Sequence, residues 1–144
     1  MTYWVINTDK LNGISLKAYD IWYKTEMAFA GDNKPTYDKH KGFFKRVSVG
    51  DYVFMYQSGE GIVGLGEIVE EWDGKTYTKA ERLFYSIDEF EYRIAVDWKP
   101  EYDTRNNPLI GKEYLPYRGY HAKIDPKKWD VEKVKKLLRE RRSS

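Results

Sequence analysis

The stretch GDYVFMYQSGEGIVGLGEI, residues 50–68, decides the fold. It holds two strand-like runs, residues 52–56 and 62–69, on either side of a Ser-Gly-Glu-Gly segment at 58–61. Aromatic and β-branched runs around a glycine-rich turn predict two antiparallel strands joined as a hairpin. Gly64 and Gly66 lie inside the second strand, where a glycine usually marks a bulge or the close approach of another segment.

Further strands and helices are predicted on both sides of this hairpin. Residues 3–6 and 92–98 are typical of strands, residues 102–120 are expected to be loop-rich, and short strands are expected near 114–115 and 121–124. Residues 15–30 are expected to be helical and residues 31–35 to form a loop. Asp125 and Pro126 predict the start of a C-terminal helix, because Asp caps helices and Pro suits the first position. Together these elements predict an α+β domain built on a curved or barrel-like sheet.

Length and composition limit the function classes. The chain has 144 residues, about one domain, and 17% aromatic residues, enough for a sound core. It has no cysteine, which excludes disulfides, zinc-thiolate sites and a cysteine nucleophile. It contains no apolar run of membrane-spanning length and no signal-peptide pattern at its start, so we expect a cytoplasmic domain.

Charge is distributed unevenly along the chain. The net charge is +2, but residues 99–144 hold 13 Lys and Arg against 7 Asp and Glu. Residues 1–98 therefore carry a net negative charge. A basic C-terminal third fits a surface that binds a polyanion, and it fits a solvated helix face equally well.

The residue patterns of catalysis are scarce. Gly59-Glu60-Gly61 lies between two strands, so no helix N-terminus follows to hold a phosphate, and a hairpin turn is the better interpretation. His40 and His121 lie far apart, without metal-ligand spacing, and we expect His40 to be solvated in its lysine-rich segment. We therefore expect no catalytic residues, no metal and no cofactor.

Three aromatic residues lie where core residues are not expected. Trp22 follows turn-rich sequence, and Tyr85 and Phe90 flank an acidic segment before the strand at 92–98. Aromatic side chains that converge from loops can stack on a flat base. Core packing is the alternative for each of them.

The central stretch resembles the middle of the PUA-like group of domains, which includes EVE and YTH domains. In that group a G-D-x-x-F-x-Y-x-S turn leads to an I-x-G-x-x-E strand, and residues 50–58 and 62–67 match these patterns. Residues 3–8, YWVINT, are similar to the F-x-x-I-K-S opening of both families, with Asn7 in place of the lysine. The resemblance covers most of residues 1–124 and implies a PUA-like fold.

The resemblance to YTH domains also implies an aromatic cage for N6-methyladenine. Asn12 lies ten residues before Trp22, as in that family, and residues 85–90, YSIDEF, have the spacing of its W-S-x-D-x-W pattern, with Tyr85 and Phe90 in place of the two tryptophans. Trp22, Tyr85 and Phe90 are thus implied as the cage, and Asn12 as the residue that contacts the base edge. The alternatives are a core role for Trp22 and a turn role for Asn12.

Four basic residues are candidates for contacts with phosphate. Lys112 and Arg118 fall near the loop in which the family carries its phosphate-binding residue, and Lys45 and Arg46 are adjacent exposed candidates. Solvated surface charge is the alternative for each of the four.

In prokaryotes, such domains form N-terminal modules of McrB-type restriction GTPases, including archaeal ones, that act on modified DNA. The resemblance implies a reader of modified bases at residues 1–124 and a helix at 125–144 that leads to a further domain. Methylated DNA, a GTPase motor domain and a nuclease subunit are then the expected partners, with no membrane involved. The other interpretations are an RNA-binding PUA-like module that reads methylated RNA, a small enzyme acting on nucleotides, or a plain interaction domain.

Overall fold

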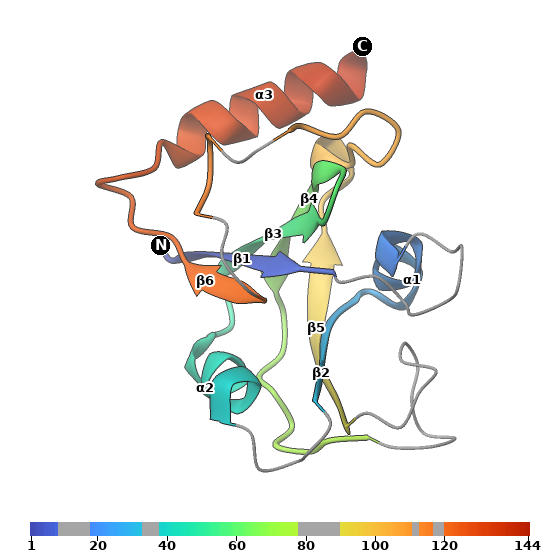
Figure 1. The fold of residues 1–144 in the computed structure, drawn as a ribbon, viewed down its shortest axis with the longest axis vertical. Coiled ribbons are helices and arrows are strands. Elements are labelled where there is room, and N and C mark those ends of the chain that lie inside the picture. Colours follow the sequence, from blue (N-terminus) through green and yellow to red (C-terminus); the bar gives the residue numbers. More distant parts are fainter. Residues whose placement is uncertain (9–17, 33–37, 78–89, 111–112, 117–119) are drawn as a thin grey trace.

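The computed structural model describes residues 1–8, 18–32, 38–77, 90–110, 113–116 and 120–144. Within them, six strands form one curved mixed sheet: β1 (Tyr3–Asn7), β2 (Met27–Asp32), β3 (Tyr52–Gln57), β4 (Gly61–Ile68), β5 (Phe90–Trp98) and β6 (His121–Lys123). Three α-helices flank the sheet: α1 (Ala18–Thr25), α2 (Asp38–Arg46) and α3 (Val131–Ser143) (Figure 1). A short 3-10 helix follows β5 at Pro100–Tyr102. The predicted α+β architecture on a curved sheet is confirmed.

The strands lie in the order β2-β5-β4-β3-β1-β6. In the described part of the chain, β1 is parallel to β3 and the other pairings are antiparallel. The hairpin predicted from residues 50–68 is confirmed, since β3 and β4 pair from Tyr52 opposite Glu67 to Gln57 opposite Gly61. Because β1 and β3 run in the same direction, the residues that follow both strands meet at one end of the sheet.

Hydrophobic clusters cover both faces of the sheet. Val53 and Met55 of β3 belong to the cluster under α1 and α2, while Phe54 and Tyr56 belong to the cluster under α3. Strands with both faces buried have nearly continuous apolar sequences. The double coverage therefore explains the unbroken apolar run that begins at residue 52.

Gly64 and Gly66 of β4 lie against neighbouring side chains, as the sequence predicts. A Cβ atom on Gly64 would lie 2.3 Å from the Tyr23 hydroxyl, and one on Gly66 would lie 2.5 Å from Cγ1 of Val96. Neither separation is compatible with a side chain. These two glycines let α1 and β5 approach β4 closely.

The predicted helix at residues 15–30 is wrong in its second half. α1 ends at Thr25, Glu26 adopts a left-handed φ of 55°, and Met27–Asp32 form β2. β2 pairs along its whole length with β5, from Met27 opposite Ala95 to Asp32 opposite Phe90. This long-range pairing overrides the local pattern, as tertiary context commonly does for short segments.

Other boundaries also differ from expectation. α2 was not predicted, residues 114–115 do not form a strand, and α3 begins at Val131 rather than near Asp125. Asp130 caps α3 by accepting a hydrogen bond from the Lys133 N–H at 3.1 Å, whereas Asp125 accepts one from the Lys127 N–H in a preceding turn. The expected strand after residue 120 is confirmed as β6. No helix in the described ranges has the length and apolar character needed to cross a membrane.

Candidate functional site

An uncharged polar cluster lies where β1 and β3 end. The side chains of Thr8 and Gln57 are buried, and the Thr8 hydroxyl donates a hydrogen bond to the Gln57 side-chain oxygen. Beside them, Nδ2 of Asn7 donates to the Ser58 hydroxyl at 2.9 Å, and that hydroxyl lies 3.3 Å from Oδ1 of Asn7. Amide and hydroxyl groups offer both donors and acceptors without net charge. This chemistry suits the edge of a neutral, planar ligand.

Sequence reasoning missed this cluster, although a signal was present. Each strand is an apolar run that ends in two polar residues, Asn7-Thr8 after β1 and Gln57-Ser58 after β3. The pairs meet only if the two strands are parallel neighbours. That pairing joins segments 49 residues apart, and no local pattern predicts it.

The turn after β3 borders the polar cluster and connects it to α1. Gly59 and Gly61 have φ values of 82° and 123°, and a Cβ on Gly61 would lie 2.3 Å from the Leu109 carbonyl oxygen. Glu60 between them accepts a hydrogen bond from the Tyr19 hydroxyl of α1 at 3.3 Å. The hairpin turn interpretation of this segment is confirmed.

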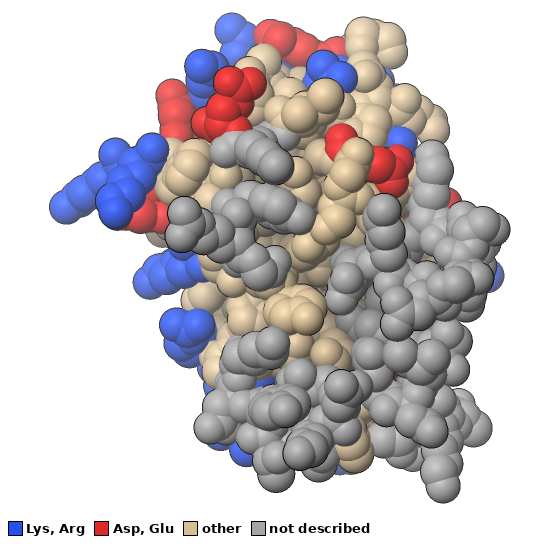
Figure 2. Space-filling model, in the orientation of Figure 1, with Lys and Arg blue, Asp and Glu red and all other residues tan. Residues whose placement is uncertain are grey.

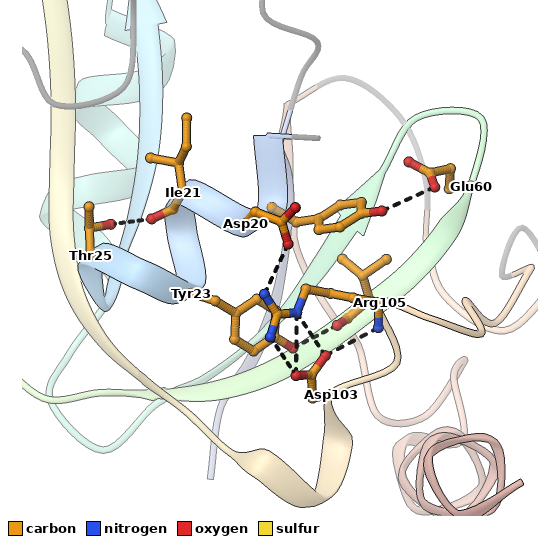
Figure 3. A network of polar contacts seen from close by, with 9 residues as sticks. Asp20, Ile21, Tyr23, Thr25, Glu60, Asp103 and Arg105 are labelled. Carbon is orange, nitrogen blue, oxygen red and sulfur yellow. Dashed lines mark hydrogen bonds and ion pairs between the residues drawn. The ribbon is translucent and has the colours of Figure 1, made fainter. Parts of the chain in front are cut away.

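A network of polar contacts holds α1 against β4 and the segment after β5. Figure 3 shows Arg105 between Asp20 and Asp103, with its guanidinium over the Tyr23 ring. Arg105 lies 2.9 Å from Asp20 and 2.8 Å from Asp103, and its Cζ is 4.0 Å from the centre of the Tyr23 ring. The Tyr23 hydroxyl donates to the Val63 carbonyl at 2.7 Å, directly beside Gly64. α1 is therefore attached to the segment after β5 through Asp20 and Arg105, and to β4 through Tyr23.

The charges in this network stabilise one another. Burial acts to raise the pKa of the Asp103 carboxyl, but the hydrogen bonds and charge of Arg105 outweigh it, so this pKa lies below its ordinary value. Hydrogen bonding to Asp103 is the main reason that the pKa of Arg105 is raised. Burial, followed by the charge of Asp103, raises the pKa of the Tyr23 hydroxyl. At neutral pH the three groups form a charged pair beside a neutral phenol.

Trp22, the first predicted cage residue, lies on α1 and is completely buried. Its ring belongs to the cluster under α1 and α2, with ring centres 5.9 Å from Phe29 and 6.3 Å from Trp98. The expectation that Trp22 lies outside the core is wrong, because α1 turns this face toward the sheet. Its role as a stacking wall stays a prediction.

Phe90, a second predicted cage residue, is the first residue of β5 and is half-buried. The Trp22 ring contacts Trp98 at the other end of β5, and it also contacts Phe29, which lies opposite Arg93, three residues from Phe90. The other two cage candidates, Asn12 and Tyr85, lie outside the described residues, as do Lys112 and Arg118.

Lys45 and Arg46 occupy the last turn of α2, and both are exposed. Cζ of Arg46 lies 5.6 Å from the centre of the Trp4 ring, and Trp4 pairs with Lys123 of β6. Directly opposed residues in antiparallel strands share a face, so Lys123 lies on the same face of the sheet as Trp4. Sequence reasoning did not select Lys123. Lys and Arg side chains follow the same flank, the left edge of Figure 2.

The two histidines meet in the fold, which corrects the expectation of a solvated His40. His40 is completely buried, and its Nδ1 lies 3.1 Å from Nε2 of His121. The His121 ring stacks on Phe43 with centres 4.4 Å apart. His40 lies on the side of α2 that packs inward, whereas Lys41 and Lys45 lie on the opposite side. The pair connects α2 to the edge strand β6.

A curved mixed sheet, a parallel β1–β3 pair and a helix docked on Gly64 of β4 together form an α+β domain. The chain belongs to the EVE domain family, which matches residues 2–112. The match includes the strands β1 to β5 and stops before β6 and α3.

Two solved structures show the same fold at low sequence identity, and a third is similar with a lower TM-score. The Pho92 YTH domain in complex with m6A has 14% identity and a TM-score of 0.55, over 96% of this chain and 86% of that one. A hypothetical protein from Leishmania major has 15% identity and a TM-score of 0.53, over 97% and 96%. Human THYN1 in complex with DNA containing 5-methylcytosine has 13% identity and a TM-score of 0.48, over 96% and 98%. No curated protein sequence matches this chain.

Proposed function

We propose that this chain is a non-catalytic module that binds a modified base flipped out of DNA, and that N6-methyladenine is the favoured base. The observation that carries the proposal is the polar cluster in which half-buried Asn7 and Ser58 lie beside buried Thr8 and Gln57. Its amide and hydroxyl groups match the mixed donors and acceptors of a base edge. Membership of the EVE family supports the proposal, as does a fold shared with a YTH domain in complex with m6A.

In this proposal Trp22, Tyr85 and Phe90 form the aromatic cage and Asn12 contacts the base edge. The position of Trp22 on α1 supports this assignment. A hydrogen bond from Tyr19 to Glu60 connects α1 to the turn beside the polar cluster. Since the Trp22 ring has no exposed surface, stacking on it requires that binding uncovers one of its faces.

The energetics limit how well a methyl group can be discriminated. Flipping a base costs a few kcal/mol, and stacking contributes about 1–3 kcal/mol per aromatic platform. Burying one methyl group adds about 0.8 kcal/mol, which corresponds to about a fourfold preference. A larger preference requires that methylation also weakens the base pair that is opened. Most of the affinity must then come from phosphate contacts, for which we propose Lys45, Arg46, Lys112 and Arg118.

A titration of matched oligonucleotides tests the function. DNA duplexes and RNAs of one sequence carry adenine, N6-methyladenine or 5-methylcytosine at one position. We expect the tightest binding to DNA with N6-methyladenine. Tighter binding to the methylated RNA supports the RNA-reading alternative instead, and equal affinity for all probes refutes base reading.

The paired variant Thr8→Val/Gln57→Leu tests the polar cluster. Replacing both hydrogen-bond partners by apolar groups of similar shape leaves no buried polar group unsatisfied, so the fold should persist. We expect the preference for the modified base to disappear. Thr25→Val is the matched control, because Thr25 donates only within α1, to the Ile21 and Trp22 carbonyls. A retained preference in the paired variant contradicts the role of the cluster.

We further propose that the chain serves as the specificity module of a modification-dependent restriction system. Residues 125–144 then lead to a GTPase motor domain, and a nuclease subunit completes the system. On this proposal the chain alone cuts nothing. Incubation with methylated duplex, Mg²⁺ and GTP should leave DNA and nucleotide intact. Turnover that survives repurification and disappears on substitution of a residue in this chain refutes it.

A further inference from the structure

A second surface with aromatic and basic side chains lies at the other end of β1. A groove of about 500 Å³ runs between the start of β1 and the segment that leads into α3. We call it the Tyr3–Trp129 groove; its lining includes the aromatic Tyr3 and Trp129 and four charged residues, Lys127, Lys128, Asp130 and Glu132. Five residues of extended chain, about 17 Å, separate Tyr3 from Thr8 in the polar cluster.

The aromatic side chains of the groove are firmly held and only half-buried. Tyr3 stacks on Tyr52 and Phe54, with ring centres 5.4 and 6.0 Å apart. Trp129 packs against the hydrophobic cluster under α3. Packing on one side fixes the rings, and the exposed remainder leaves apolar surface available to a ligand.

Of the four charged residues that line the groove, the two lysines are available to an anion, because the two carboxylates are engaged locally: Asp130 caps α3 and Glu132 lies 3.6 Å from Lys135. Asp125 beside them accepts the Lys127 N–H. Lys127 and Lys128 are exposed, and within the described residues neither forms an ion pair. Figure 2 shows basic side chains projecting at the left edge, where Figure 1 places the segment between β6 and α3.

We propose that the Tyr3–Trp129 groove is a second nucleic-acid contact, which receives the DNA backbone that flanks the flipped base. Lys127 and Lys128 hold phosphates, and Trp129 covers the face of a sugar or base. Exposed lysines beside an aromatic platform are the combination that binds a nucleic-acid strand without reading its sequence. The 17 Å to the polar cluster corresponds to about five base pairs at about 3.4 Å each. This inference rests on the proposed function.

The test combines the variant Lys127→Ala/Lys128→Ala with duplexes of two lengths. Both duplexes carry one N6-methyladenine with about ten base pairs on one side and either about two or about ten on the other, the short side is tested in both orientations, and unmethylated copies are measured in parallel. Two lost phosphate contacts should reduce the slope of log K against log salt by about 1.8. Between 50 and 200 mM salt, the wild type should therefore lose about tenfold more affinity for the long duplex than the variant does.

Shortening the duplex should weaken binding to the wild type and leave binding to the variant unchanged, because both changes remove the same contact. The ratio of affinities for methylated and unmethylated DNA should not change. Lys24→Ala/Lys75→Ala is the control, since it removes the same charge at exposed positions that do not line the groove.

Equal effects of the two lysine pairs, or a variant that still responds to duplex length, refute the second contact. The proposed function stands in that case if the wild type still prefers methylated DNA. A wild type that binds both long duplexes equally contradicts base reading and leaves a backbone contact only. A wild type that binds no duplex refutes both proposals.

Discussion

Replacing Gly64 with alanine should destabilise the protein through one atom, the Tyr23 hydroxyl oxygen. The new Cβ would lie 2.3 Å from that oxygen and 3.1 Å from Cζ of the same ring. The ring cannot stay in place, so the hydrogen bond from Tyr23 to the Val63 carbonyl is lost. Overpacking costs about 1–3 kcal/mol and the hydrogen bond about 1 kcal/mol, so we expect a loss of about 2–4 kcal/mol.

A double-mutant cycle isolates this contact. Tyr23→Phe removes the hydroxyl and should cost about 1 kcal/mol, because the Val63 carbonyl keeps the Thr104 N–H at 3.3 Å as a partner. In the Tyr23→Phe background, Gly64→Ala meets only a ring carbon that must shift by a few tenths of an ångström. Its cost should then fall by at least about 1 kcal/mol relative to the wild-type background.

Urea denaturation of the four proteins measures the cycle. Gly42→Ala in α2 is the control, since nothing lies within 4 Å of its Cβ position. Alanine is the better helix former by about 1 kcal/mol, so this variant should be more stable than wild type. Additive effects of Gly64→Ala and Tyr23→Phe would show that the clash is relieved elsewhere and would refute the reasoning.

Three further predictions follow from the same structure. Asp103→Asn should lower the unfolding free energy by about 1 kcal/mol at pH 7. Because the folded-state pKa of Asp103 lies below 3.8, urea denaturation should show the difference shrinking as the pH falls through it. Lys45→Ala/Arg46→Ala should reduce the slope of log K against log salt for DNA binding by up to about 1.8, with the preference for methylated DNA unchanged. An unaltered slope would show that neither side chain contacts phosphate. Trp22→Ala should cost about 3–5 kcal/mol by thermal or urea denaturation. Trp22→Phe should stay folded and lose affinity for the modified base, and unchanged affinity assigns Trp22 to the core alone.

The hairpin and its glycines were predictable because the information is local. Residues 50–68 hold both strands, the turn between them and the two glycines that admit neighbouring segments. The short strand expected at residues 121–124 is found as the edge strand β6. The C-terminal helix was predicted, but its start was misplaced because two Asp residues, Asp125 and Asp130, both suit a cap and only the second one caps the helix.

Features that depend on distant pairing were not predictable. β2 forms against β5, whose paired residues lie 58 to 68 positions away, and the polar cluster exists only because β1 lies parallel to β3. Of the predicted site, Trp22 is in the core and Phe90 is half-buried at the start of β5. Asn12, Tyr85, Lys112 and Arg118 lie outside the described residues, so their roles stay predictions.

The contact between His40 and His121 has a consequence for how this family varies. A single hydrogen position lies between Nδ1 of one ring and Nε2 of the other, so the tautomer of each histidine dictates the tautomer of its partner. A side chain that replaces one ring must still complement the other, as an amide facing a single imidazole would. Positions 40 and 121 should therefore change together among relatives, and a chain that keeps one histidine should carry a hydrogen-bonding residue at the other position.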